Sequence, residues 1–542
     1  MRERIRILTR RGLTLLGFTF ADLLMPGSLL AQTPAPIPAA MPYTLTFAPQ
    51  SFPGQALLPA MQNYVEAGSN GRWLVVGGRV QGLHMFQTTP ARNFPPASAN
   101  RSLVVIEPAS GKSWSLPLAG FPANIADPLA ATGLQGCHDP GEGMFYVAGG
   151  YGLDSTTQKM ITFPNLIRIP LGPTIGVITD PSLSDAAKVA KLAPTFTAIT
   201  NDAFAVTGGG LKKVQNRLYL IFGQKFTGDY YAFSSGINQV YTESVRQINL
   251  KLDPLTFLSS SDSPKPADPS HPYHRRDGSV VDTIDPDTGR PLFAAFGGVF
   301  QVGSTLGYGQ PILIDDNQGA PTVTINAAVE QLFSQYECPV VSVYDPTGQA
   351  MYHSFFGGIS HTYYAQTPTQ QAIYELIIGQ NRADGVPFIA DISTLALMAG
   401  GKSAQFLHLD PIAMTPIPQG VIDGYFGKLS PQDRQKYQVT TTNLIGASVD
   451  FWADPSLVAS GKMTANGVIR LDAFQPGESA VVGYVFGGIA AVFPYALIPS
   501  HGTYASNTLF AVTLTKTPSA AWPASVGKTA TTNGPPAGVV KP

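Results

Sequence analysis

Side chains that can contact a ligand gather directly after a recurring pair of glycines. Five such pairs and one degenerate copy occur, each ending an apolar segment, and the residues that follow mix aromatic rings with basic and hydroxyl groups. Aromatic rings offer apolar contact area while neighbouring polar groups supply hydrogen bonds, so this mixture is typical of sugar or peptide recognition. The candidate binding residues are Arg79, His84, Tyr151, Lys225, Tyr230, Tyr231, His361, Tyr363 and Tyr364.

No catalytic residue is predicted. The chain lacks G-x-S-x-G, H-E-x-x-H and G-x-G-x-x-G in the structural context that these motifs require. Cys137 and Cys338 form no CxxC pair, and His271 and His274 lie in a polar loop with no third ligand in view. We therefore expect no bound metal and no cofactor.

The glycine pairs mark an internal repeat. The copies are GRWLVVGG ending at Gly78, GMFYVAGG at Gly150, RPLFAAFGG at Gly298, AMYHSFFGG at Gly358 and AVVGYVFGG at Gly488, with NRLYLIFGQ (216–224) as the degenerate one. In that copy Gly223 is taken as the first glycine and Gln224 replaces the second. The first glycines are mostly 60 to 74 residues apart, and the last interval is 130.

Each glycine pair closes a predicted hairpin. Asp285–Pro286 and Asp345–Pro346 lie twelve residues before their glycines, and Asp–Pro favours a tight turn because proline presets φ. A third apolar strand such as 102–108 follows each pair, and the first unit continues into a fourth strand that carries Trp114. Four antiparallel strands repeated radially form the blades of a β-propeller.

The predicted fold is therefore all-β, a six-bladed propeller of four-stranded antiparallel blades. Seven blades is the alternative, because the interval of 130 residues has room for one more; an insertion over 422–465 is preferred. The alternating segment 43–49 has no other role, so we expect this N-terminal strand to close the last blade and cover its edge. In such a ring Cys137 and Cys338 lie near opposite rims, too far apart for a disulfide.

The glycine-paired strands, the VVIEP…W hairpin of the first unit and the four-strand rhythm resemble kelch-repeat β-propellers over 43–516. The units exceed the usual kelch length of about 50 residues, so the chain resembles a divergent, bacterial-type secreted relative. Some kelch-like propellers are copper oxidases of galactose type and others are sugar epimerases. The resemblance implies copper only in the oxidase case, which requires a Cys–Tyr crosslink, two histidines and a further tyrosine.

The N-terminus is predicted to direct export. Five arginines precede the apolar stretch 12–21, and 28–31 offers a small-residue cleavage site, which indicates a signal peptide over 1–31. A Pro/Ala linker (32–42), the propeller (43–516) and a flexible tail (517–542) follow. No later stretch is long and apolar enough to span a bilayer, so we expect no transmembrane segment after cleavage and a periplasmic or extracellular location.

Composition narrows the partners. The 542 residues carry a net charge of −1, only 13% are charged, and no basic face stands out, which argues against nucleic acid. The long, dissimilar loops after the glycine pairs share one face, whereas the uniform Asp–Pro turns are typical of a scaffold. We predict a binding or protein-interaction scaffold that holds a protein or carbohydrate ligand on the glycine-pair face. A propeller enzyme acting on carbohydrate is the alternative.

Overall fold

The computed structural model describes most of the predicted repeat region. The described residues are 41–85, 93–230, 238–304, 306–316, 319–360, 362–366, 371–375, 388–408, 432, 444–492 and 502–517. The predictions of a signal peptide, most of the linker and most of the tail fall outside these residues. Among them, no helix has the length and apolar character needed to cross a membrane.

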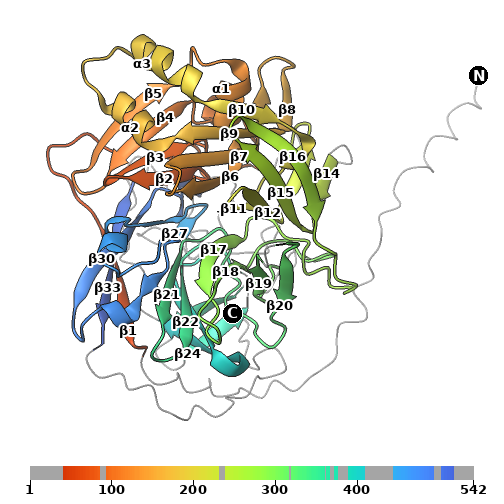
Figure 1. Ribbon diagram of the computed structural model, residues 1–542. Helices are drawn as coiled ribbons and strands as arrows, with labels where there is room; N and C mark the ends of the chain where they lie inside the picture. The colour runs from red at the N-terminus through yellow and green to blue at the C-terminus, as the bar shows by residue number, and fades with distance from the viewer. Residues whose placement is uncertain are drawn as a thin grey trace, which may run out of the picture.

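Four-stranded antiparallel sheets dominate the described part of the chain, which confirms the predicted all-β class (Figure 1). Four sheets have four strands each, and a five-stranded and a seven-stranded sheet each contain the same four-stranded antiparallel unit. We call these six units sheets 1 to 6 in chain order and name the strands of each from the first to the last position. Sheet 1 contains β2 (Val65–Ser69), β3 (Arg72–Val76), β4 (Ser102–Glu107) and β5 (Lys112–Pro117). Sheet 2 contains β6 (Thr132–Asp139), β7 (Met144–Asp154), β9 (Asn165–Pro170) and β10 (Thr197–Thr200). Sheet 3 contains β11 (Gly210–Val214), β12 (Arg217–Ile221), β15 (Val245–Leu252) and β16 (Leu255–Asp262).

The remaining three sheets repeat this order, and the sixth recruits the N-terminal strand. Sheet 4 contains β17 (Ser279–Ile284), β18 (Pro291–Phe296), β19 (Ile312–Asp315) and β20 (Thr322–Ile325). Sheet 5 contains β21 (Val340–Asp345), β22 (Ala350–Phe356), β25 (Ile392–Met398) and β26 (Lys402–His408), with β29 (Ile469–Arg470) parallel to β21. Sheet 6 contains β28 (Phe451–Ala453), β30 (Ser479–Phe486), β33 (Leu509–Lys516) and β1 (Tyr43–Pro49). The segment 43–49 therefore pairs with β33 at the edge of the last sheet, as predicted.

Apolar side chains on both faces of each strand bury it between two neighbouring sheets. In β3, Leu74 and Val76 pack toward sheet 2, whereas Trp73 and Val75 pack toward sheet 6. This alternation explains why the second strands are continuous apolar runs, since a strand buried on both faces has no polar side. Further apolar clusters join sheets 2 and 3, sheets 3 and 4, and sheets 4 and 5.

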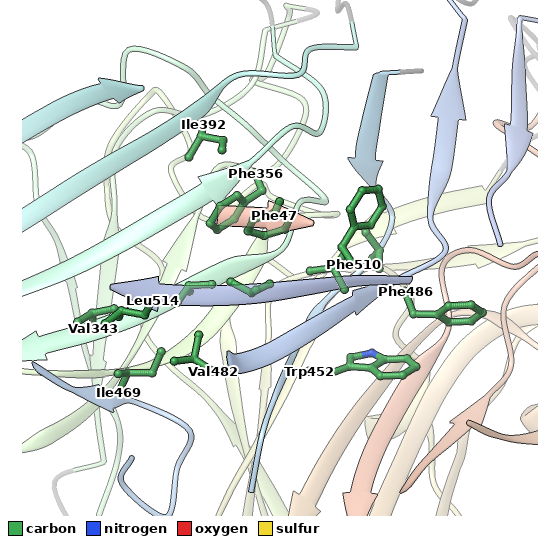
Figure 2. Packing of buried hydrophobic residues seen from close by; sticks show 14 of the residues in the cluster. Phe47, Val343, Phe356, Ile392, Trp452, Ile469, Val482, Phe486, Phe510 and Leu514 are labelled. Atoms are coloured by element: carbon green, nitrogen blue, oxygen red, sulfur yellow. The ribbon is translucent and has the colours of Figure 1, made fainter. Parts of the chain in front are cut away.

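The largest cluster joins sheet 6 to both sheet 5 and sheet 1. Figure 2 shows Phe47 of β1 against Phe356 of β22, and their rings stack with centroids 3.8 Å apart. Trp452 of β28 stacks on Trp73 of β3 at 5.7 Å. The sequence of packed neighbours thus runs from sheet 1 through sheet 6 and returns to sheet 1.

The glycine pairs follow the second strand of each sheet, with one correction to the predicted register. Both residues of every intact pair have positive φ. In four of the five pairs the second glycine donates its N–H to the segment that leads into the next sheet, as Gly78 does to Ala131 O at 2.8 Å. In sheet 3 the residue that makes this bond is Gly223, to Arg275 O at 2.8 Å. Gly223 therefore holds the second position, and Phe222, with φ of 57°, holds the first. The prediction that Gln224 replaces the second glycine was wrong by one residue.

A circuit of hydrogen bonds passes once through each sheet at the glycine-pair end. Each sheet contributes one residue with positive φ, which lies at or just before the first strand of that sheet. This residue donates its N–H to the corresponding residue of the preceding sheet at 2.6–3.0 Å. The acceptor is a backbone carbonyl in every case except Asn63, which accepts through its side-chain Oδ1. The ring residues are Asn63, Gly133, Gly208, Asp277, Glu337 and Ser448. Because the last bond returns to Asn63, the circuit surrounds one axis.

Several helices and small sheets, which were not predicted, lie outside sheets 1 to 6. Helices α1 (Ala123–Leu129), α2 (Leu171–Thr179) and α3 (Asp185–Leu192) lie beside sheets 1 and 2, and α6 (Ser456–Ala459) follows β28 (Figure 1). β7 extends beyond its glycines into a layer with β8 (Lys159–Thr162), β13 (Gln224–Thr227) and β14 (Asn238–Tyr241). The other small sheets are β23 (Thr362–Gln366) with β24 (Gln371–Glu375), and β27 (Leu444–Ala447) with β31 (Ile489–Ala491) and β32 (Thr503–Ala505).

Strand β28 lies within the range 422–465 that was predicted as an insertion. It pairs with β30 and supplies the first strand of sheet 6. Most of the earlier part of that range, including the glycines of 421–429, lies outside the described residues. The connection from β28 to β30 is long and carries α6 and β29.

Candidate functional site

Four of the predicted binding residues converge on one ring, that of Phe94. Arg79 places its guanidinium 5.1 Å from the Phe94 centroid, and the His84 ring lies 4.7 Å from it. Tyr151 and Tyr230 contact the same ring edge-on, at 5.5 and 5.6 Å. Loops that leave sheets 1, 2 and 3 therefore meet at the glycine-pair end.

These contacts are packed against each other. Arg79 is only 3% exposed and donates to Pro95 O at 2.7 Å and to Gln81 Oε1 at 3.1 Å. Burial lowers its pKa to about 10, so it stays cationic at neutral pH. The Tyr151 hydroxyl donates to Gly228 O at 2.7 Å, and burial raises its pKa. Such contacts fix the loops to one another.

His84 should stay uncharged over most of the acid range. Burial, together with the cations Arg276 and Arg79, lowers its pKa to about 4, although the bond to the Met85 carbonyl opposes the shift. Because this value lies below that of an unfolded histidine, the stability that His84 contributes is present above about pH 6.5 and is lost as the pH falls toward 4. NMR titration of the ring signals, assigned with His84→Gln, should give a midpoint near 4, and a midpoint near 6.5 would contradict this packing.

Among the five other predicted residues, the structure describes Lys225, Tyr363 and Tyr364. Lys225 lies near the start of β13 and forms an ion pair with Asp202. Tyr363 and Tyr364 belong to β23. Tyr231 and His361 lie outside the described residues.

A carboxyl pair lies on the hydrogen-bond circuit itself. Glu337 accepts a hydrogen bond from the Ser448 hydroxyl, and Asp277 forms an ion pair with Arg276. Burial and the nearby Asp277 carboxylate raise the pKa of Glu337 to about 8. At this end the axis is therefore surrounded by the hydrogen-bonded backbone and by a carboxyl group that is protonated at neutral pH.

A cavity of about 1140 Å³ opens at the opposite end, among the Asp–Pro turns. Its wall includes the β6–β7 turn at Asp139, the β17–β18 turn at Arg290 and part of the β28–β30 connection at Asn466. A narrower channel of about 270 Å³ adjoins it and is lined by the first strands of all six sheets. Lys212, Asp282 and Asn466 line both spaces, so the channel communicates with the wider cavity.

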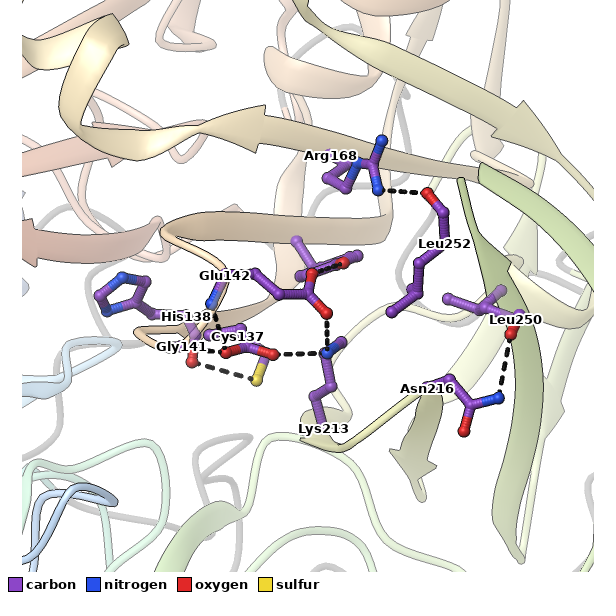
Figure 3. Close-up of polar contacts among 11 residues, drawn as sticks. Cys137, His138, Gly141, Glu142, Arg168, Lys213, Asn216, Leu250 and Leu252 are labelled. Carbon is purple, nitrogen blue, oxygen red and sulfur yellow. Dashed lines mark hydrogen bonds and ion pairs between the residues drawn. The ribbon is translucent and has the colours of Figure 1, made fainter. Parts of the chain in front are cut away.

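Ion pairs between sheets hold the cavity wall. The Lys213 ammonium contacts Asp139 at 2.5 Å and Glu142 at 2.9 Å, which ties sheet 3 to sheet 2. Figure 3 shows Lys213 pointing toward Glu142. Lys212 binds Asp282 of sheet 4 at 2.5 Å. Desolvation disfavours the Lys212 charge, but the Asp282 carboxylate outweighs it and the pKa is raised. Lys212 is therefore charged and paired.

Glu66 and Asp450 face the channel from sheets 1 and 6. Burial raises the pKa of each carboxyl, and for Glu66 the nearby Asp450 raises it further. Asp450 is accessible from the channel although protein surrounds it, because the channel itself provides the accessible surface. The Glu66 Oε2 atom is buried and has no hydrogen-bond partner among the described residues. The Trp452 N–H lowers the pKa of Glu66 and so opposes this rise, but it forms no hydrogen bond of good geometry with the carboxylate among the described residues.

Sequence reasoning missed these channel residues because it looked only at loops. A signal was present: Glu66, Lys212 and Asp282 are charged residues inside the first, otherwise mostly apolar, strand of a unit. In sheets arranged around an axis, the first strand borders the central channel. A charge at such a position therefore predicts a channel lining. The predicted glycine-pair face remains untested as a binding surface.

Comparisons with known proteins add little. No protein-family model matches the chain, and no curated protein matches it. Among solved structures the chain is similar to that of YjhT, with 9% sequence identity and a TM-score of 0.40, over 84% of this chain and 95% of that chain. A likeness of this size carries no argument about function.

Proposed function

We propose that this chain is an exported, six-bladed kelch-like β-propeller that acts as a binding protein in the cell envelope or outside the cell. Three features support the six blades: the glycine pairs after each second strand, the apolar clusters between successive sheets and the hydrogen-bond circuit. The arginine-rich, apolar N-terminus supports export.

The wide cavity at the Asp–Pro end is the observation that carries the binding role. Pockets of about 300–1,000 Å³ hold small molecules, and specificity comes from a few polar groups that converge in them. With a volume of about 1140 Å³, this cavity lies slightly above that range, and charged side chains from sheets 2, 3 and 4 border it. We place the ligand there, at the end opposite the hydrogen-bond circuit, and the glycine-pair face is the alternative surface.

A carbohydrate-active enzyme is the second candidate, because of the Glu66 and Asp450 carboxyl groups. Two neighbouring carboxyls with displaced pKa values are the arrangement from which glycoside-cleaving enzymes take an acid and a base. Hydrolysis of a bound oligosaccharide that is lost in both Glu66→Gln and Asp450→Asn would favour this candidate. Unchanged oligosaccharide after prolonged incubation favours the binding protein.

Plugging the cavity tests the binding role. Asn466 is exposed and lines both spaces, so Asn466→Trp should fill them and weaken ligand binding about tenfold or more. Calorimetry should measure binding of neutral oligosaccharides, amino sugars, polyamines and short peptides to the purified full chain.

The control substitutes an exposed asparagine outside both cavities. Asn238→Trp adds the same ring at the start of β14 and should leave binding unchanged. Binding that survives Asn466→Trp but is lost in Asn238→Trp would move the site to the other end. Failure of the whole panel to bind would contradict the proposed function.

A further inference from the structure

The channel at the base of the wide cavity carries more negative than positive groups. Glu66, Asp282 and Asp450 line it together with a single cation, Lys212. Lys212 is bound to Asp282 at 2.5 Å, which neutralises both. Glu66 and Asp450 are therefore the acidic groups that the channel leaves for a ligand, and in its absence the pKa of each is raised.

One of these carboxyls lacks a partner where a partner would be expected. Glu66 Oε2 is buried and accepts no hydrogen bond of good geometry among the described residues, although the Trp452 N–H lies close enough to favour the ionised carboxylate. A buried oxygen in this state costs about 1–3 kcal/mol, so native proteins rarely keep one without a function or a guest molecule. Because Glu66 lines the channel, a guest that donates hydrogen bonds can reach it.

We infer that the channel receives the primary ammonium group of a ligand whose remainder fills the wide cavity. This inference rests on the proposed binding function and names the chemistry of the ligand. An ammonium group has three donors, which suits Glu66 and Asp450 converging from two neighbouring sheets. The channel volume of about 270 Å³ accepts an aminoalkyl chain end or one sugar ring.

The protonation of the pair adds a second readout. The ionisable groups near it are Tyr64, Lys212, Asp282 and the Cys338 thiol. Burial keeps both carboxyls protonated above their ordinary range, and an entering ammonium favours their ionised forms. Binding should therefore release protons, and affinity should rise with pH until the pair is ionised in the free protein.

Calorimetry with matched probes tests the inference on the full chain. A tetramer of glucosamine carries free amines, and its fully N-acetylated counterpart has the same sugars without the charge. We expect the amine tetramer to bind at least tenfold more tightly, with proton release in buffers of different ionisation enthalpy. Spermidine serves as the second amine: tight binding of spermidine alone assigns the ammonium to a polyamine, and of the tetramer alone to an amino sugar, each in support.

Four variants test the effect of charge on amine affinity: two should weaken binding, one should strengthen it and one should leave it unchanged. Glu66→Gln and Asp450→Asn should each weaken amine binding about 10- to 100-fold, because each removes one partner of a buried charge pair. Lys212→Gln removes the only cation of the channel lining and should strengthen amine binding several-fold. Asp185→Asn removes an exposed charge on α3, away from the channel, and should leave binding unchanged.

Besides a complete absence of amine binding, two results would overturn the inference. One is equal binding of the amine and N-acetylated tetramers. The other is amine binding that neither Glu66→Gln nor Asp450→Asn alters. If neither amine binds at all, the inference also fails, but the proposed function fails only when the neutral oligosaccharides and peptides do not bind either.

Discussion

Replacing Gly357 by alanine should destabilise the protein by about 3–5 kcal/mol, because two costs add at this site. Its φ of 58° is one that residues with a side chain adopt at a cost of about 1–2 kcal/mol. A Cβ atom there would lie 1.9 Å from Ile445 O, a backbone atom that cannot turn away. The midpoint of urea unfolding, followed by tryptophan fluorescence, should fall accordingly.

A second glycine separates the two costs. Gly461 has φ of 71°, and a Cβ there would meet nothing within 4 Å. Gly461→Ala should therefore cost only the backbone term of about 1–2 kcal/mol. Equal losses in the two variants would show that the glycine pairs are needed for their backbone angle alone, and not for close approach of one sheet to the next.

Replacing Glu337 by glutamine should stabilise the protein above pH 8. Burial and Asp277 raise the pKa of Glu337 from 4.5 to about 8, so the unfolded chain releases this proton before the folded chain does. The contribution of Glu337 to stability therefore falls as the pH rises from about 4.5 to 8, and is constant above that. A shift of this size corresponds to about 5 kcal/mol at most, and access of water reduces it to about 2–4.

Glutamine keeps the shape and the acceptor for Ser448 but does not titrate. The gain in unfolding free energy should vanish near pH 4.5, where the wild-type carboxyl is protonated in both states. Glu478→Gln is the control, because Lys462 holds the pKa of that carboxyl below its usual range. It should lose stability at high pH where Glu337→Gln gains. A pH-independent effect of Glu337→Gln would contradict the buried carboxyl.

Strand positions were predictable wherever the sequence is punctuated. Strands β3, β18 and β30 end immediately before a glycine pair. Both faces of these strands are buried, so an apolar run directly precedes the two glycines in the sequence. The alternating segment 43–49 was placed correctly because it had no other partner in the repeat. The position of Phe222 in the repeat was not predicted, because the sequence gives no sign that a phenylalanine adopts the left-handed conformation usual for glycine.

The helices were missed for a physical reason. The residues of β9 run directly into α2 as one apolar stretch, and periodicity alone does not divide a buried strand from a short buried helix. α3 has a recognisable N-cap, since the Ser184 hydroxyl accepts the Ala187 N–H at 3.3 Å. A single cap in a chain dominated by strand repeats was not enough to predict it.

Part of the candidate site was predictable and part was not. Loops that follow equivalent strands share one end of the fold, so the placement of Arg79, His84, Tyr151 and Tyr230 at that end follows from the repeat, whereas their meeting at Phe94 does not. Which end is open does not follow, because that depends on the hydrogen-bond circuit and on the β28–β30 connection. The Glu66 and Asp450 carboxyls lie far apart in sequence and come together only because sheet 6 packs against sheet 1.

The pairing of β1 with β33 makes the order of the sheets independent of where translation starts. Thr517 N donates to Pro42 O at 2.9 Å, so residues that flank β1 and β33 touch. A short peptide joining them, with new termini opened between Gly400 and Gly401 in the β25–β26 turn, would give a circular permutant with every strand pair intact. Evolution has the same freedom, and can shift the start of such a gene without redesigning any sheet.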